Sequence, residues 1–263
     1  MEARDYLESL FGGSGRRAVV TGASSGLGAE MTRVLASAGF AVLGVARRRE
    51  RLEALAREAH QAGLPGRIVP HVADLAEGDQ VDGVASAAHE ALGGCDVLVA
   101  NAATSSVARV ERMRPEDFRR DLELNLHSPW RLSRALHGAL AESRAGRVIH
   151  VASIYGLGAP ALNGLGAYAV AKHAVVGLTR SQAVEWARDG ITVNALAPGY
   201  FPTEMTEGVV DDPQVAAKLL PYTALRRFGR PEELGTALLF LASPASSYVT
   251  GVILPVDGGW TAR

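Results

Sequence analysis

Short apolar runs alternate with longer stretches of helical character along almost the whole chain. Runs such as Val97 to Ala100 lack the polar alternation of a half-exposed strand, so they indicate strands buried on both faces. Alternation with short connections predicts a parallel sheet with helices on both faces. We predict strands at 17–21, 40–46, 67–72, 96–100, 147–152, 191–195 and 252–256.

Between these strands we predict helices at 28–38, 50–61, 81–92, 167–188 and 231–241, with 115–142 mostly helical. No internal repeat or linker divides the chain, which predicts one α/β domain over residues 1–263. Four prolines punctuate the stretch 199–231. Long irregular segments in compact domains are often lids, so we predict a substrate lid at about 200–230. The alternative is a short surface helix flanked by turns.

Composition excludes several classes of protein. The net charge of -1 gives no reason to expect nucleic acid or an anionic membrane as partner. The longest apolar stretch near the end, 237–242, is too short to span a bilayer. Residues 1–13 carry three acidic side chains, which is unlike a secretory signal and predicts a cytoplasmic protein. A single cysteine and seven scattered histidines predict no metal site.

A glycine-rich turn follows the first predicted strand. It reads Gly-x-x-x-Gly-x-Gly, where glycines let the backbone approach a ligand and the next helix points free N–H groups at a pyrophosphate. A turn at this place is typical of Rossmann-type doubly wound sheets. The alternative is a turn that needs glycine only for packing. The predicted cofactor-binding residues here are Gly22, Ser24, Ser25, Gly26, Leu27 and Gly28.

The second predicted strand is followed by arginines instead of a carboxylate. An acidic residue at this place binds the ribose 2′-hydroxyl of NAD, whereas a guanidinium can bind the 2′-phosphate of NADP. We therefore predict NADP(H) in preference to NAD(H), with Arg47 and Arg48 at the phosphate. The alternative is a solvated basic start to the next helix, paired with Glu50 and Glu53.

Tyr168 and Lys172 lie four residues apart, which places them on one face of a helix. We expect the ammonium and an oxidised nicotinamide both to lower the pKa of the phenol and so prepare it for proton transfer near neutral pH. Ser153 lies at the end of the fifth predicted strand, where its hydroxyl could hold a substrate oxygen. Taken alone, a Tyr-x-x-x-Lys spacing is common on amphipathic helices; together with Ser153 and the glycine turn it predicts a catalytic site.

These motifs together resemble the short-chain dehydrogenase/reductase family over nearly the whole chain. The resemblance implies a single-domain Rossmann-type sheet of about seven strands. It assigns Asn125, Ser153, Tyr168 and Lys172 to catalysis, with Asn125 holding a water in a proton relay. It adds these cofactor-binding residues to Tyr168, Lys172 and those above: Asp74, Leu75, Asn101, Ala102, Ala103, Pro198, Gly199, Phe201 and Thr203.

Two departures from the family pattern concern the site. Ala103 stands where the family often has glycine, and the interval between Ser153 and Tyr168 is about two residues longer than is common. The insert 156–164 could reshape the substrate pocket. The expected pocket lining, which is mixed apolar and aromatic, includes Ala103, Ile154, Tyr155, Leu162, Tyr200, Met205 and Tyr222.

The sequence thus predicts an oxidoreductase that moves a hydride between a nicotinamide cofactor and a ketone or secondary alcohol, with Tyr168 as general acid or base. The alternative class is a non-catalytic cofactor-binding module. The substrate stays open between a sugar acid, similar to that of gluconate 5-dehydrogenases, and a 3-oxoacyl or secondary-metabolite ketone. The resemblance also implies a homo-oligomer, either a dimer or a tetramer, formed through the helices 115–142 and 167–188.

Overall fold

The computed structural model describes residues 3–143 and 145–262, so Met1 and Glu2 of the acidic N-terminal run lie outside the described residues. Within them, a single parallel sheet has seven strands in the order β3-β2-β1-β4-β5-β6-β7. This confirms the predicted α/β fold class. The strands are β1 Arg17–Thr21, β2 Ala41–Ala46, β3 Arg67–Val72, β4 Val97–Ala100, β5 Arg147–Val151, β6 Thr192–Pro198 and β7 Ile253–Val256.

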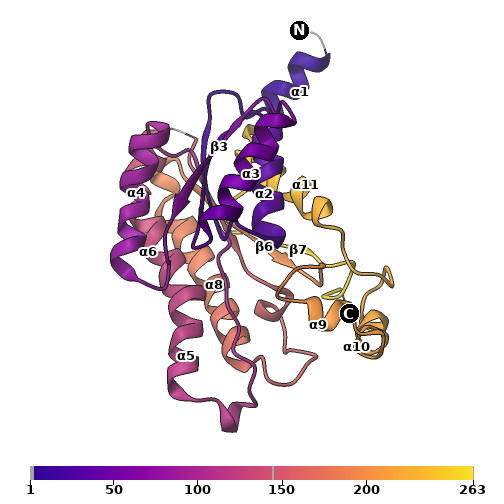
Figure 1. Ribbon diagram of the computed structural model, residues 1–263. Coiled ribbons are helices and arrows are strands. Elements are labelled where there is room, and N and C mark those ends of the chain that lie inside the picture. The colour runs from indigo at the N-terminus through magenta and orange to yellow at the C-terminus, as the bar shows by residue number, and fades with distance from the viewer. Residues whose placement is uncertain (1–2, 144, 263) are drawn as a thin grey trace.

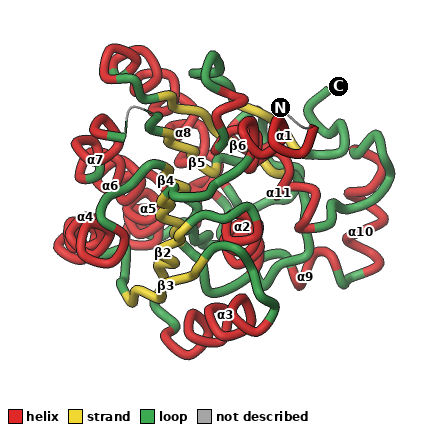
Figure 2. The backbone as a smooth tube through the Cα atoms, turned by 90° about the horizontal axis from the view of Figure 1, so that it is seen from above, coloured by secondary structure: helices red, strands yellow, loops and turns green. Residues whose placement is uncertain are grey.

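Helices cover both faces of the sheet (Figure 2). One layer consists of α2 (Gly26–Ser37), α3 (Arg49–Gln61) and α11 (Pro231–Ala242). The other consists of α4 (Gly78–Leu92), α6 (Ser128–Ala135), α7 (His137–Glu142) and α8 (Gly166–Glu185). Figure 1 shows α9 (Glu207–Val210) and α10 (Pro213–Leu219) at the periphery of the molecule. No helix of the described part is long and apolar enough to cross a membrane.

The central strands are buried because both of their faces contact helices. Every residue of β4 and β5 is buried, as their continuous apolar character predicts. Alternate residues serve opposite cores: Val97 packs toward α2 and α11, whereas Leu98 packs toward α4 and α6. This alternation follows from the two-residue repeat of strand side chains.

The predicted helix 115–142 is interrupted. It consists of α5 (Pro115–Leu122), a π-helical turn at Glu123–His127, α6 and α7. A π-helical turn inserts one residue into the regular ladder of hydrogen bonds, and such turns are frequent at functional sites. Asn125 lies in this turn and is buried. A first helix, α1 (Ala3–Phe11), was not predicted.

The order of strands reverses beside β1, and this opens a crevice at the carboxyl ends of β1 and β4. Two backbone N–H groups, of Asn101 and Ala102, donate to Thr21 Oγ1 at 2.9 Å each. The side-chain amide of Asn101 also donates to the Thr21 carbonyl at 2.9 Å. These bonds hold together the two loops that diverge from the crevice. Ligands of doubly wound sheets bind at such a place.

Candidate active site

A cleft of about 380 Å³ runs along the carboxyl ends of the strands. Its walls are formed by the loops that follow β1 to β4, the end of β5, the start of α8 and the segment after β6. Every residue predicted to bind cofactor lines it: Gly22, Ser24, Ser25, Gly26, Leu27, Gly28, Arg47, Arg48, Asp74, Leu75, Asn101, Ala102, Ala103, Tyr168, Lys172, Pro198, Gly199, Phe201 and Thr203. Ser153 lines it as well, whereas Asn125 does not.

The turn between β1 and α2 has the backbone that its glycines predict. Gly22 and Gly26 have φ values of +69° and +51°, a region that glycine adopts without steric cost. A Cβ placed on Gly28 would lie 2.1 Å from the Gly22 carbonyl oxygen. Ser25 occupies the N-cap of α2 without capping it through its side chain. The turn therefore leaves the backbone N–H groups at the start of α2 available to a phosphate, which fits the predicted dinucleotide.

The two arginines after β2 have different surroundings. Arg48 donates to Ser24 Oγ at 3.2 Å and to Ser25 Oγ at 2.5 Å, so it lies against the glycine turn. Arg47 is 73% exposed and lies 3.7 Å from Asp74. Both guanidinium groups border the cleft, but only Arg48 is held by hydrogen bonds to the glycine turn, the turn proposed to bind the pyrophosphate.

Ser153, Tyr168 and Lys172 meet at the end of β5. Ser153 Oγ accepts a hydrogen bond of 3.1 Å from the Tyr155 N–H, which leaves its own proton free to donate to the Tyr168 oxygen. Lys172 Nζ donates to the Val151 carbonyl at 2.7 Å and lies 5.4 Å from the centre of the Tyr168 ring. The helical spacing of Tyr168 and Lys172 thus brings both side chains beside the last residues of β5.

The pKa of Tyr168 corrects one expectation. Burial raises this pKa to about 12, although the hydrogen bond with Ser153 opposes the rise. Burial also lowers the pKa of Lys172 to about 7. The expected lowering by the ammonium is absent because Lys172 is only partly charged near neutral pH and its Nζ contacts a carbonyl instead of the phenol oxygen.

Asn125 lies beside the cleft, outside its surface. Its side-chain amide donates to the carbonyls of Thr104 and Asp121, at 2.8 Å each. Its Oδ1 is buried and has no hydrogen-bond partner among the described residues. The π-helical turn that carries Asn125 packs against α8, the helix of Lys172. A buried acceptor without a partner is suited to bind an ordered water.

An aromatic cluster lies beyond Tyr168. Tyr155 and Tyr200 share a hydrogen bond of 2.5 Å between their hydroxyl groups. The Tyr200 ring lies 5.5 Å from that of Trp260 and 6.1 Å from that of Phe228, measured between centroids, and Tyr222 lies 5.4 Å from Trp260. Of the expected pocket residues, Tyr155 and Tyr200 belong to this cluster. Tyr222 is 57% exposed, so only part of its ring is packed.

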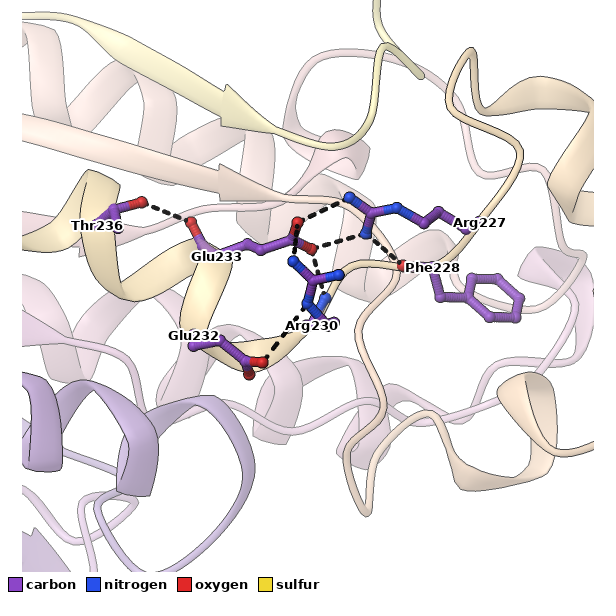
Figure 3. A network of polar contacts seen from close by, with 6 residues as sticks. All are labelled: Arg227, Phe228, Arg230, Glu232, Glu233 and Thr236. Atoms are coloured by element: carbon purple, nitrogen blue, oxygen red, sulfur yellow. Dashed lines mark hydrogen bonds and ion pairs between the residues drawn. The ribbon is translucent and has the colours of Figure 1, made fainter.

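The segment predicted as a lid is anchored at its far end (Figure 3). Arg227 binds the Glu233 carboxylate through two nitrogens at 2.7 Å each, and the backbone N–H of Arg230 donates to the same group at 2.8 Å. These bonds join the end of the segment to the first turn of α11. The segment contains two short helices, α9 and α10, where the alternative to a lid was one short surface helix flanked by turns.

Several residues of the cleft were not predicted. They are Ala46, Ala73, Leu124, Val151, Ala152, Glu204 and Thr206. Most present a backbone or a small side chain, but Glu204 brings a carboxylate that pairs with Arg48 and Arg51. The sequence shows only that Glu204 directly follows the predicted Thr203, and its pairing with arginines more than 150 residues away is a tertiary contact.

The fold and the cleft together define a dinucleotide-binding α/β protein, and comparison with known proteins agrees. Residues 22–261 match the family model described as enoyl-(acyl carrier protein) reductase. The chain is 37% identical to 3-oxoacyl-(acyl-carrier-protein) reductase of Thermotoga maritima over 246 residues, 93% of this chain and 97% of that relative. It is 36% identical to gluconate 5-dehydrogenase of Gluconobacter oxydans over 254 residues, 96% of this chain and 97% of that relative.

Solved structures of other proteins are similar to this one over nearly the whole chain. Gluconate 5-dehydrogenase from Burkholderia cenocepacia, in complex with NADP and tartrate, superposes with a TM-score of 0.91 at 34% identity, covering 98% of this chain and 99% of that one. The RhlG/NADP complex of Pseudomonas aeruginosa superposes with a TM-score of 0.90 at 32% identity, covering 96% and 99%. The chain belongs to the short-chain dehydrogenase/reductase family, whose named members are oxidoreductases.

Proposed function

We propose that the protein is an NADP(H)-dependent oxidoreductase that interconverts a ketone and a secondary alcohol, with Tyr168 as the proton donor or acceptor. The observation that carries this proposal is the meeting of Ser153, Tyr168 and Lys172 in the cleft that the glycine turn opens. The nicotinamide supplies or accepts the hydride when it is bound. Ser153 holds the substrate oxygen, and Tyr168 transfers the proton to or from it.

Lys172 and Asn125 support the proton transfer. The Lys172 pKa of about 7 lets this group gain and lose a proton near neutral pH. Asn125 Oδ1 is suited to hold a water beside α8, which would link the buried lysine to other proton carriers. Both side chains act through Tyr168, which is the group that contacts the substrate directly.

NADP(H) is the preferred cofactor in this proposal. The cleft presents Arg47 and Arg48 where the 2′-phosphate would lie, and no described carboxylate directly follows β2. The named relatives in complex with NADP support the choice. A guanidinium binds a phosphate through charge-assisted, bidentate hydrogen bonds, whereas the hydroxyl of NAD gains much less from it.

The substrate we propose is a neutral, moderately apolar ketone. A smaller pocket, lined by Tyr200, Arg227 and Glu233 among others, adjoins the cleft at Phe201. Among the described residues that line the cleft and this pocket, the cationic side chains are Arg47, Arg48, Lys172 and Arg227. Arg47 and Arg48 follow β2 on the cofactor side, Lys172 donates to the Val151 carbonyl, and Glu233 neutralises Arg227. Among these lining residues, a sugar acid would therefore find no unpaired guanidinium outside the cofactor side for its carboxylate, while the Tyr200 ring, which packs against Tyr155 and Trp260, suits an apolar group.

A turnover assay tests this function. Purified protein is mixed with NADPH and a panel of ketones, and consumption is followed at the nicotinamide absorbance. Sustained consumption supports an enzyme, and faster consumption of apolar ketones than of keto sugar acids supports the substrate class. Binding of NADPH without turnover across the panel, and across alcohols with NADP⁺, would indicate a non-catalytic cofactor-binding module instead.

We also propose a cytoplasmic homo-oligomer, a dimer or a tetramer. The helices α6 and α8 expose apolar side chains, with Trp130 at 43%, Val170 at 50% and Val184 at 81%. Exposed apolar surface of this kind favours association. Light scattering coupled to size-exclusion chromatography checks the oligomeric state, and a monomer at micromolar concentration would contradict the proposal.

The lid at 200–230 is likewise a proposal, which hydrogen exchange with and without NADPH would test.

A further inference from the structure

Glu204 lies between two guanidinium groups at the edge of the cleft. Its Oε2 accepts from Arg48 at 2.9 Å, and its Oε1 accepts from Arg51. Arg48 comes directly before α3 and Arg51 lies in its first turn, whereas Glu204 follows β6, more than 150 residues away along the chain. The carboxylate thus joins the segment after β6 to the start of α3.

The groups around Glu204 have the chemistry of a phosphate site. Besides the two guanidinium groups, the hydroxyls of Ser24 and Ser25 contact Arg48 and border the same part of the cleft. Forked guanidinium donors match phosphate geometry, and a phosphate carries more charge and more acceptor oxygens than a carboxylate. Glu204 is ionised at neutral pH, because the hydrogen bonds from Arg51 and Arg48 lower its pKa to about 2.

We propose that Glu204 occupies the 2′-phosphate site of the free protein, and that the 2′-phosphate of NADP displaces its carboxylate from Arg48 and Arg51. This inference rests on the proposed preference for NADP(H) and adds two residues to it. Arg51 becomes a second contact of the 2′-phosphate, and Glu204 becomes a competing anion that weakens 2′-phosphate binding. AMP and NAD carry no 2′-phosphate and leave the two ion pairs in place.

The size of the effect follows from exposure. The side chains of Arg48, Arg51 and Glu204 are 42%, 51% and 49% exposed. Exposed ion pairs are individually weak, so displacing the carboxylate costs little. Removing the charge of Glu204 should therefore tighten 2′-phosphate binding by about three- to tenfold, in keeping with the loss of two weak competing pairs.

Calorimetric titration with adenosine 2′,5′-bisphosphate and with AMP tests the proposal without turnover. Glu204→Gln should tighten the bisphosphate about three- to tenfold and leave AMP unchanged, because the variant frees both guanidinium groups. Arg51→Gln should weaken the bisphosphate and leave AMP unchanged. Glu207→Gln is the matched control, since it removes an exposed carboxylate three residues further along the chain.

A double variant separates displacement from a general charge effect. In the Arg48→Met background, Glu204→Gln should tighten the bisphosphate less than it does in the wild type, because only the competition at Arg51 remains. Suppose that the wild type prefers the bisphosphate over AMP and that Glu204→Gln does not change this preference. That result would overturn the role of Glu204 and leave the proposed NADP preference standing. Equal binding of bisphosphate and AMP by the wild type would overturn the proposed NADP preference together with this inference. If Glu207→Gln tightens the bisphosphate as much as Glu204→Gln does, the effect comes from the net charge of the protein. That result would overturn the proposed displacement of the Glu204 carboxylate.

Discussion

Lys172 Nζ lies 5.4 Å from the centre of the Tyr168 ring and gives its hydrogen bond to the Val151 carbonyl. The ammonium is therefore held by the end of β5, and the phenol oxygen has Ser153 as its neighbour. Burial lowers the pKa of Lys172 to about 7 and raises that of Tyr168 to about 12. The free protein thus keeps Tyr168 protonated at neutral pH, as its proposed role of proton donor in ketone reduction requires.

Tyr168→Phe should lower kcat by about 10²- to 10⁴-fold, the usual contribution of a general acid. The variant removes one hydroxyl, so the Kd for NADPH, measured by fluorescence, should stay within a few-fold of the wild type. Tyr248→Phe is the control, because it removes the phenol hydroxyl of an exposed tyrosine that does not line the cleft. A Tyr168→Phe enzyme with kcat within tenfold of the wild type would refute the assignment of the proton donor.

The buried lysine should make stability depend on pH. Its pKa is about 7 in the folded protein and near 10.5 in the unfolded chain, so the unfolded state binds more protons between these values. The free energy of unfolding should consequently rise with pH from 7 toward 10, by up to about 1.4 kcal/mol per pH unit. Below pH 7 both states hold the proton and the destabilising effect of burial is complete.

Lys172→Met isolates this contribution in thermal unfolding between pH 6 and 9. The variant should be more stable relative to the wild type at pH 6 than at pH 9, since only the wild type gains stability over this range from Lys172. Subtracting the two curves removes the contributions of Cys95 and Tyr168, whose raised pKa values act above pH 9 in both proteins. Lys218→Met, at an exposed lysine on α10, should show no such trend. If stability changes with pH in the same way in the wild type and in Lys172→Met, the lowered pKa of the buried lysine would be disproved.

Local sequence patterns predicted the sheet, the glycine turn and the catalytic candidates Ser153, Tyr168 and Lys172, whereas the family resemblance supplied the cleft residues after β3, β4 and β6. The apolar runs identified all seven strands to within two residues at most boundaries, because burial on both faces leaves a continuous apolar signal. The glycine turn and the helical pair Tyr168 and Lys172 were also visible, since both depend on spacing within one segment. The carboxyl ends of parallel strands then bring these segments to one edge.

The parts that could not be predicted depend on tertiary contacts. The pairing of Glu204 with Arg48 and Arg51 joins residues more than 150 positions apart, and no local period reports it. The π-helical turn at Asn125 is one residue inserted into a helical pattern. The direction of the Tyr168 pKa shift depended on how deeply the phenol is buried, which a helical spacing does not reveal.

Arg48 should contribute more to NADP binding than Arg47. Arg48 is held against Ser24 and Ser25, while Arg47 lies 3.7 Å from Asp74 and is 73% exposed. Arg48→Met should weaken NADPH binding by about tenfold or more, as expected for loss of a charge-assisted contact of 1.5–3 kcal/mol, and leave NADH binding nearly unchanged. Arg47→Met should have a smaller effect on the ratio of the two Kd values.

The same ratio tests the sequence-based assignment of Arg47. Arg47→Asp should shift preference toward NADH, because a carboxylate next to the 2′-phosphate repels it and can accept from a ribose hydroxyl. Arg57→Asp, at a side chain 65% exposed near the end of α3, serves as control because it makes the same change of charge away from the cleft. If Arg47→Met lowers the preference for NADPH more than Arg48→Met does, the ranking of the two arginines is reversed.

Gly28→Ala should destabilise the protein and abolish the phosphate turn. The added Cβ would lie 2.1 Å from the Gly22 carbonyl oxygen and 2.6 Å from Asn101 Nδ2, and the first of these belongs to the backbone and cannot turn aside. Overpacking of this kind costs about 1–3 kcal/mol, and we expect the free energy of unfolding in urea to fall by that amount. Gly83→Ala is the matched control, because Gly83 is exposed within α4 and an added Cβ there meets nothing within 4 Å. That variant should gain about 0.5–1 kcal/mol from helix propensity alone. Equal stabilities of the two alanine variants would show that the turn can relax, and that Gly28 is not required for the close approach of β1 and α2.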